Sequence, residues 1–180
     1  MSARKLAADK LLWKPLGRWK RPSPELDRIQ FLKTVPFFDR LSNRQLKSVS
    51  DIMFERTYEI DESIFEEGQP GAALFLILEG KVAIEIYREI STTRLAVLES
   101  GAFLGEMALL DETPRSANAQ ALERTRTLAL YRNDLNELVL RDPKTACQIY
   151  RSLAGMIADR LRLTNELVQM KTPADQIGLG

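Results

Sequence analysis

The first hydrophobic pattern in the chain is helical. Ile29 and Leu32 fall on one face of a predicted helix, and Pro36 interrupts that run. Ser42 is a good N-cap for a second helix, whose apolar residues would face one way. We therefore expect a small helical subdomain over residues 26–53.

The pattern changes to that of short strands between residues 54 and 131. Apolar runs rich in Ile, Val, Phe and Leu alternate there with glycines. Seven or eight short strands with glycine turns predict a mainly β domain, an antiparallel β-barrel or jelly roll (double-stranded β-helix). The candidate strands are FERTYEI, SIFEE, ALFLILE, KVAIEIYR, TRLAVLE, SANAQALE and TRTLALY. In KVAIEIYR, Val82, Ile84 and Ile86 would be buried, and Ala83, Glu85 and Tyr87 would be wetter.

Helical spacing returns over residues 133–170. Asn133 or Asp134 would cap one helix, and Asp142 with Pro143 would start a second. We expect the first half of the long helix to pack on the barrel and the second half on another copy of the chain, which predicts a homodimer. Arg160 interrupts its apolar seam, which is formed by Ile149, Leu153, Met156, Leu163, Leu167 and Met170.

Length and composition suit one soluble domain. The chain has 180 residues, of which 44% are hydrophobic and 28% charged, and no apolar run approaches the roughly 18 residues of a membrane span. With Cys147 as its one cysteine and no histidine, the usual hydrolase triads and zinc sites are excluded. We expect a cytoplasmic protein that is not an enzyme and holds no metal or cofactor.

The charge is unevenly distributed along the chain. Residues 1–21 contain seven Lys or Arg and a single Asp, although the whole chain carries a net charge of only +1. We divide the chain into a basic arm (1–25), one domain (26–170) and a tail (171–180). An arm that also carries Trp13 and Trp19 can contact anionic lipid, nucleic acid or a partner, and it can equally pack on the domain.

One loop, GEMALLDETPRSANA at residues 105–119, has the features of a ligand site. Gly105 permits close backbone approach, and the start of a short helix at EMALL would present amides to an anion. Arg115 could clamp the same anion, and Glu106 could accept a hydrogen bond from a hydroxyl beside it, as on a sugar phosphate. The alternative is an Arg–Glu ion pair that braces a surface loop.

The loop strongly resembles the phosphate-binding cassette of the cyclic-nucleotide-binding domain. That family includes the catabolite activator protein, protein kinase A regulatory subunits and cyclic-nucleotide-gated channels. Leu104 replaces a phenylalanine of the pattern, Met107 replaces a leucine, and Ala72 stands where the family often has an acidic residue. The resemblance extends through VPFFDRLSNRQLKSV and EEGQPGAALFLILEGKVAI, over about residues 28–165.

The resemblance assigns roles to the cassette residues. Glu106 would take the ribose 2′-hydroxyl, and Arg115 would take the exocyclic oxygens of the cyclic phosphate. The ligand would be cAMP or cGMP, with cAMP slightly favoured, since Ser116 does not decide the base. The rest of the cradle would come from Gly105 and from the backbone around Met107, Ala108, Leu109, Ser116 and Ala117.

The leading hypothesis is a sensor module that binds a cyclic nucleotide and signals to an unknown effector protein by moving its C-terminal helices. One alternative is a ligand-independent dimerisation module or scaffold with a vestigial pocket. Another is a transcription regulator that acts through a partner. We do not expect the chain itself to bind DNA, because the residues after Tyr131 are used by the predicted helices and leave no winged helix-turn-helix.

Overall fold

Three short helical segments come before the strands. The computed structural model describes residues 28–88 and 90–171, so the predicted arm at 1–25 lies outside the described residues, as does nearly all of the tail. Ser42 caps the third segment through a capping box, in which Gln45 N–H donates to Ser42 Oγ and Ser42 N–H donates to Gln45 Oε1. The segments are α2 (Arg28–Thr34), η1 (Pro36–Phe38) and α3 (Asn43–Ser50).

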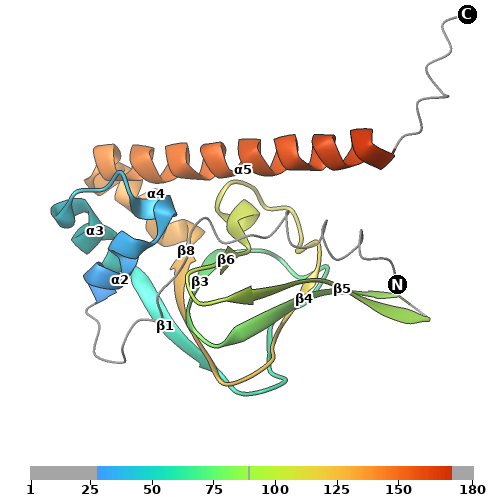
Figure 1. The fold of residues 1–180 in the computed structure, drawn as a ribbon. Coiled ribbons are helices and arrows are strands. Elements are labelled where there is room, and N and C mark those ends of the chain that lie inside the picture. Colours follow the sequence, from blue (N-terminus) through green and yellow to red (C-terminus); the bar gives the residue numbers. More distant parts are fainter. Residues whose placement is uncertain (1–27, 89, 172–180) are drawn as a thin grey trace, which may run out of the picture.

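The strands form two four-stranded antiparallel sheets (Figure 1). One sheet has the order β1-β8-β3-β6 and the other the order β2-β7-β4-β5. The chain is therefore mainly β with flanking helices, in a jelly-roll-like arrangement, which confirms the predicted fold class. The strands are β1 (Met53–Tyr58), β2 (Ser63–Phe65), β3 (Ala73–Glu79), β4 (Lys81–Arg88), β5 (Ser91–Glu99), β6 (Phe103–Leu104), β7 (Asn118–Ala121) and β8 (Thr125–Tyr131).

The sheet that contains β3 and β8 is covered on both faces. Leu74 and Leu76 of β3 pack into a hydrophobic cluster with the helices, whereas Phe75 and Ile77 pack into a second cluster with the other sheet. A strand buried on both faces has no polar face, which explains the unbroken apolar run of ALFLILE. Two hydrophobic cores therefore lie on opposite sides of one sheet.

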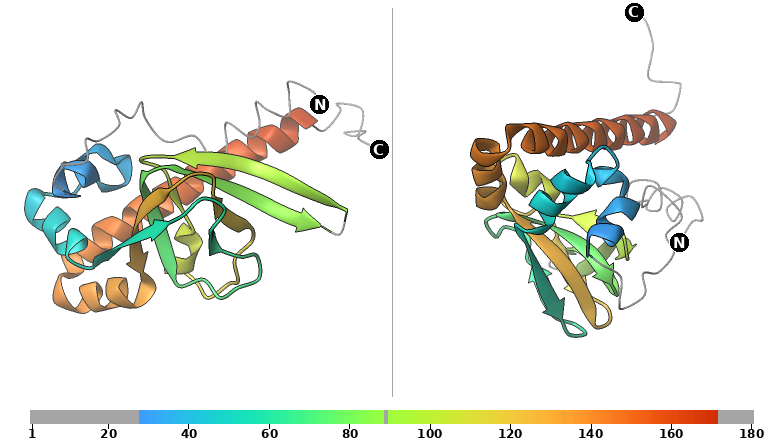
Figure 2. Two further views of the ribbon diagram at one scale, coloured as in Figure 1. Left: turned by 90° about the horizontal axis from the view of Figure 1, so that it is seen from below. Right: turned by 90° about the vertical axis from the view of Figure 1, so that its left-hand side faces the viewer.

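Two helices follow the last strand: α4 (Arg132–Arg141) and α5 (Pro143–Lys171). The predicted cap at Asn133 or Asp134 is wrong, because α4 begins earlier, with Tyr131 as its N-cap residue and no side-chain cap. The predicted start of α5 is confirmed, and Asp142 accepts hydrogen bonds from the backbone and hydroxyl of Thr145. In Figures 1 and 2, α5 runs along one side of the two sheets, beside the cassette.

Strand β4 departs from the alternation that its sequence predicts. Ala83 and Glu85 are buried, although the pattern places them on the wetter face, and only Tyr87 of that set is exposed. Glu85 is covered because Arg94 of β5 and the hydroxyl of Tyr87 both bond its carboxylate. The ladder with β5 is also irregular between Ile84 and Glu85. The cross-strand contact with Arg94 therefore accounts for the burial of Glu85, against the simple period of two.

Among the described helices, none combines the length and the apolar character needed to cross a bilayer.

Candidate functional site

The backbone of Arg115 is fixed to the turn that precedes β3. The amide N–H of Gly68 donates to the carbonyl oxygen of Arg115 at 2.8 Å. The amide N–H of Arg115 donates in turn to the carbonyl oxygen of Gln69 at 2.9 Å. These two bonds join segments that lie more than forty residues apart in the sequence. They hold the backbone of Arg115 beside the turn that precedes β3.

The guanidinium of Arg115 binds two backbone carbonyl oxygens. Nη2 donates to the oxygen of Ala73 at 2.8 Å, and Nη1 donates to that of Gly105 at 3.1 Å. The guanidinium carbon lies 4.2 Å from the centre of the Phe65 ring, a cation–π contact. The Nε atom is buried and, within the described part of the chain, has no hydrogen-bond partner.

Arg115 carries a partly buried charge that no carboxylate neutralises. Burial lowers the pKa of the guanidinium, and the nearby charge of Glu106 partly offsets this. An arginine nevertheless stays protonated at neutral pH. Arg115 forms no ion pair with a described Asp or Glu, and its guanidinium faces two carbonyl oxygens and the ring of Phe65. A cation in this state, with an unused buried N–H, suits an anionic ligand.

Two glycines make room for this arrangement. Gly105 has a φ of +73°, and a Cβ atom on it would lie 2.4 Å from Nη1 of Arg115. A Cβ atom on Gly71 would lie 2.8 Å from the Cβ atom of Ala108. Both distances are too short for any real side chain, so these positions require glycine for the backbone to approach the guanidinium and the short helix.

Glu106 is paired with a residue other than the one that spacing suggested. Its side chain is only 6% exposed, and its Oε1 atom forms an ion pair with Nη1 of Arg160 from α5. The predicted alternative of a loop-bracing pair between Glu106 and Arg115 is therefore not what the structure has. Arg160 also lies over the ring of Phe103, at 6.0 Å.

The other predicted site residues are distributed around this centre. Glu106, Met107, Ala108 and Leu109 form the 3₁₀ helix η2 (Glu106–Leu109), as the predicted one-turn helix required. The amide of Ala108 is used within the turn, donating to the Gly105 oxygen at 3.2 Å. Leu109 belongs to the core beside the helices, and Ala117 to the core between the sheets, while Met107 and Ser116 are exposed.

The segment that carries this site matches a known protein domain. The family model described as "Cyclic nucleotide-binding domain" matches residues 55–142, which include the whole cassette. The chain belongs to the cyclic nucleotide-binding domain family. Its members are regulatory domains, and some relatives carry them fused to enzymes.

Relatives of this cyclic nucleotide-binding domain occur in several architectures. The Cyclic AMP receptor protein of Thermus thermophilus is 37% identical over 73% of this chain. A cyclic nucleotide-gated potassium channel of Mesorhizobium japonicum is 32% identical over 69% of it. The crystal structure of the N-terminal domain of a transcriptional regulator from Streptomyces coelicolor is 31% identical, with a TM-score of 0.66, and the match covers 81% of this chain and 99% of that one.

The chain spans only part of the curated relatives it matches. It covers 59% of the length of the Thermus thermophilus protein and 33% of that of the channel.

Several residues of the site were not found from the sequence of this cyclic nucleotide-binding domain. Phe65 and the carbonyl of Ala73 contact Arg115, although they precede it by more than forty residues, so no local motif joins them. Arg160 did leave a signal, because it is a charged residue in an otherwise apolar helical seam. The interruption of the seam did not indicate that Glu106 would be the partner of Arg160. Among the described residues there is no group of His, Cys, Asp and Glu that could hold a metal ion.

Proposed function

We propose that this domain binds a cyclic nucleotide, cAMP or cGMP, with Arg115 holding the cyclic phosphate. The observation that carries the proposal is the partly buried guanidinium of Arg115, which, among residues 28–88 and 90–171, has no carboxylate partner and no acceptor for its buried Nε–H. A phosphate oxygen would supply both the missing acceptor and the missing negative charge. The name of the Thermus thermophilus relative, Cyclic AMP receptor protein, supports this ligand class.

Glu106 takes the ribose hydroxyl in this proposal. Glu106 follows Gly105 in the chain, and the carbonyl oxygen of Gly105 accepts a hydrogen bond from Arg115. One small ligand can therefore reach the side chains of both Glu106 and Arg115. A hydroxyl beside the phosphate would donate to the carboxylate. The proposal therefore requires a nucleotide with a free 2′-hydroxyl.

The signal leaves the site through α5. Arg160 of α5 already binds Glu106, so a ligand hydroxyl that reaches the same carboxylate changes the environment of that ion pair. A ligand shifts a conformational equilibrium only through contacts that differ between the two states. In this proposal the contact between Glu106 and Arg160 is the one that differs between the two states, and its position on α5 supports a movement of that helix as the output.

A second copy of the chain is the partner that we propose for α5. Ala154 and Leu161 lie seven residues apart on one face of this helix, and both are exposed. Small residues let two helices approach closely, and Leu161 would lose water from its surface on contact.

Titration calorimetry with cAMP, cGMP and 5′-AMP tests the ligand assignment. We expect binding of at least one cyclic nucleotide and much weaker binding of 5′-AMP. Arg115→Ala should weaken the binding at least about tenfold, because a charged hydrogen bond in a buried site contributes roughly 1.5–3 kcal/mol. Arg124→Ala is the matched control, since Arg124 is an exposed arginine that pairs with the surface carboxylate of Glu59.

Two outcomes would contradict the proposal. Equal affinity of Arg115→Ala and the unmodified protein would remove Arg115 as the phosphate ligand. No binding of any cyclic nucleotide to the unmodified protein would favour a scaffold module instead. Thermal denaturation with the same nucleotides gives an independent check, because a bound ligand raises the melting temperature.

A further inference from the structure

The loop at residues 65–71 forms one wall of the arginine site. Phe65 supplies the ring on which the guanidinium of Arg115 lies, and Gly68 and Gln69 supply the two backbone bonds to Arg115. Gly71 makes room beside the guanidinium for the short helix. The position of Arg115 therefore depends on where this loop is held.

The loop has few regular contacts of its own with the sheets. Strand β2, which leads into it, is three residues long and pairs with β7 only at Ser63 and Phe65, with an irregular register between them. Residues 66–70 are exposed, and the side chain of Gln69 bonds back to Glu66 within the loop. A segment of this kind needs an anchor outside its own ladder if it is to hold a neighbour in place.

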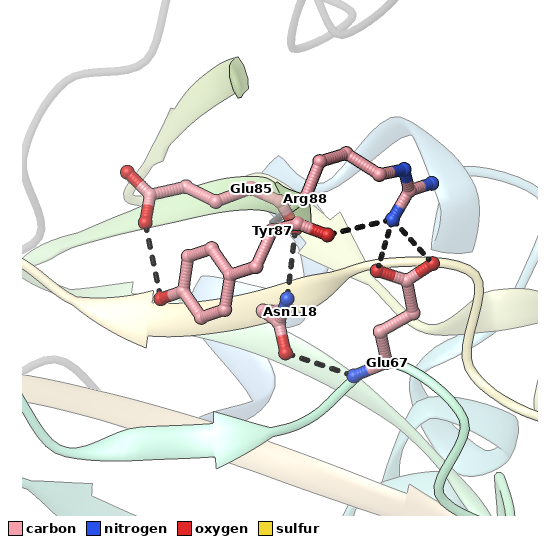
Figure 3. Close-up of polar contacts among 5 residues, drawn as sticks. All are labelled: Glu67, Glu85, Tyr87, Arg88 and Asn118. Carbon is pink, nitrogen blue, oxygen red and sulfur yellow. Dashed lines mark hydrogen bonds and ion pairs between the residues drawn. The ribbon is translucent and has the colours of Figure 1, made fainter. Parts of the chain in front are cut away.

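Asn118 supplies that anchor from strand β7. Its Oδ1 accepts a hydrogen bond from the backbone N–H of Glu67 at 2.9 Å, and its Nδ2 donates to the carbonyl oxygen of Glu85 at 3.3 Å. Figure 3 shows the amide lying between the 65–71 loop and strand β4, with one end bonded to each. Asn118 is only 7% exposed, so water cannot readily replace these bonds.

A second link to the loop lies at the surface. Arg88, at the end of β4, forms an ion pair with the carboxylate of Glu67, at 3.1 Å (Figure 3). Most of the Arg88 side chain is exposed, and an exposed pair contributes little to stability. The buried amide of Asn118 is therefore the stronger of the two links.

We propose that Asn118 is a positioning residue for Arg115. It ties the 65–71 loop to β4 and thereby holds the ring, the backbone bonds and the guanidinium in the arrangement that receives the anion. An asparagine suits this role because one amide both accepts and donates, which an aliphatic side chain cannot do. Because the phosphate role of Arg115 belongs to the proposed function, the affinity arm of the test rests on that proposal.

Asn118→Ala and Asn118→Leu test the inference, and the second variant keeps the branched shape and the number of non-hydrogen atoms of the side chain. Both should weaken cyclic-nucleotide binding about three- to tenfold, since the two lost hydrogen bonds no longer order the loop. Gln120→Ala is the matched control, because Gln120 lies two residues further along β7 and bonds the oxygen of Asp61, away from the arginine. It should bind as the unmodified protein does.

Hydrogen exchange of the ligand-free protein separates positioning from general destabilisation. In both Asn118 variants the amides of Gly68 and Arg115 should exchange faster, while the amides of β8 keep their protection. Unchanged exchange at Gly68 and Arg115, or affinity losses no larger than that of Gln120→Ala, would overturn the role of Asn118. If the unmodified protein binds no cyclic nucleotide, the proposed function fails, and the exchange experiment still decides whether Asn118 orders the loop.

Discussion

Arg115 is held by backbone carbonyl oxygens rather than by a carboxylate. Carbonyl dipoles orient the guanidinium through Ala73 and Gly105 but do not cancel its charge, so the cation keeps its attraction for an anion. A carboxylate in the same place would satisfy the arginine and compete with a phosphate. At the scale of single residues, the site therefore combines an oriented cation with two glycines that let the backbone come close to it.

Gly105→Ala tests whether the close approach of the backbone matters. The new Cβ atom would lie 2.4 Å from Nη1 of Arg115, so the guanidinium must move, and the positive φ adds strain of roughly 1–2 kcal/mol. We expect a lower free energy of unfolding and cyclic-nucleotide binding weakened at least about tenfold, a factor that corresponds to about 1.4 kcal/mol. Chemical denaturation and calorimetry measure the two effects.

Gly68→Ala is the comparison for this variant. Gly68 has a φ of +83°, but a Cβ atom there meets no other atom within 4 Å. It should show similar strain and a smaller loss of affinity than Gly105→Ala. Equal losses of affinity in the two variants would mean that the contact with the guanidinium is unimportant.

Helix α5 connects the cassette to the helical side of the molecule. Its first half, which the sequence predicted to pack on the barrel, contributes Ile149, Leu153 and Met156 to the hydrophobic cluster that the helices share with β3 and β8. One turn after Met156, Arg160 reaches the buried carboxylate of Glu106. At the scale of the element, one helix is thus both a core component and the partner of a site residue.

Arg160→Met tests the link between α5 and the cassette. The substitution keeps an aliphatic side chain but leaves the buried carboxylate of Glu106 without its cation. We expect a loss of about 1–3 kcal/mol in the free energy of unfolding, less than for a fully buried pair because Arg160 is partly exposed. Chemical denaturation measures this loss.

Two further variants make the test specific to this ion pair. Arg162→Met removes a surface pair with Asp159 on the same helix and should change stability by no more than about 0.5 kcal/mol. The double variant Glu106→Gln with Arg160→Met should recover part of the loss, since no buried charge is left alone. A loss in Arg160→Met no larger than that in Arg162→Met would show that the pair does not hold α5.

Across the whole molecule, the sheet with β3 and β8 lies between the helices and the second sheet. The helix-side core fixes α5, and the core between the sheets contains Phe75 and Ala117, close in sequence to the residues that frame Arg115. The proposed shift of α5 would reach the cassette through the ion pair of Arg160 with Glu106. Figure 2 also shows the hairpin of β4 and β5 extending away from the rest of the sandwich.

Leu161→Arg tests the proposed dimer. Leu161 is 59% exposed on the outward face of α5, and a charge there should oppose the approach of a second helix. Sedimentation velocity should show a dimer for the unmodified protein and a shift toward monomer for this variant. Leu140→Arg, an equally apolar and even more exposed position on α4, should leave the dimer intact. A monomeric unmodified protein would contradict the proposal.

Much of the fold could be predicted from local pattern. The strands β3, β4 and β8 have the predicted bounds, because each is a clear apolar run between turn residues. The two-residue β6 was missed, since so short a strand exists only through its pairing with Phe75 and Leu76. The burial of Glu85 was also missed, because it depends on Arg94 from the neighbouring strand.

Local patterns were enough to predict most of the helices and strands, the glycine turns and the segment that carries Gly105, Glu106 and Arg115, because these depend on residues close together in the chain. The partners of these residues depend on how distant segments pack. In the folded chain, Phe65 and Ala73 contact Arg115. Glu106 forms an ion pair with Arg160, and the 65–71 loop is hydrogen-bonded to Asn118. The physical reason is that the partner of a buried polar or charged group is set by which distant segments the packing brings within hydrogen-bonding reach.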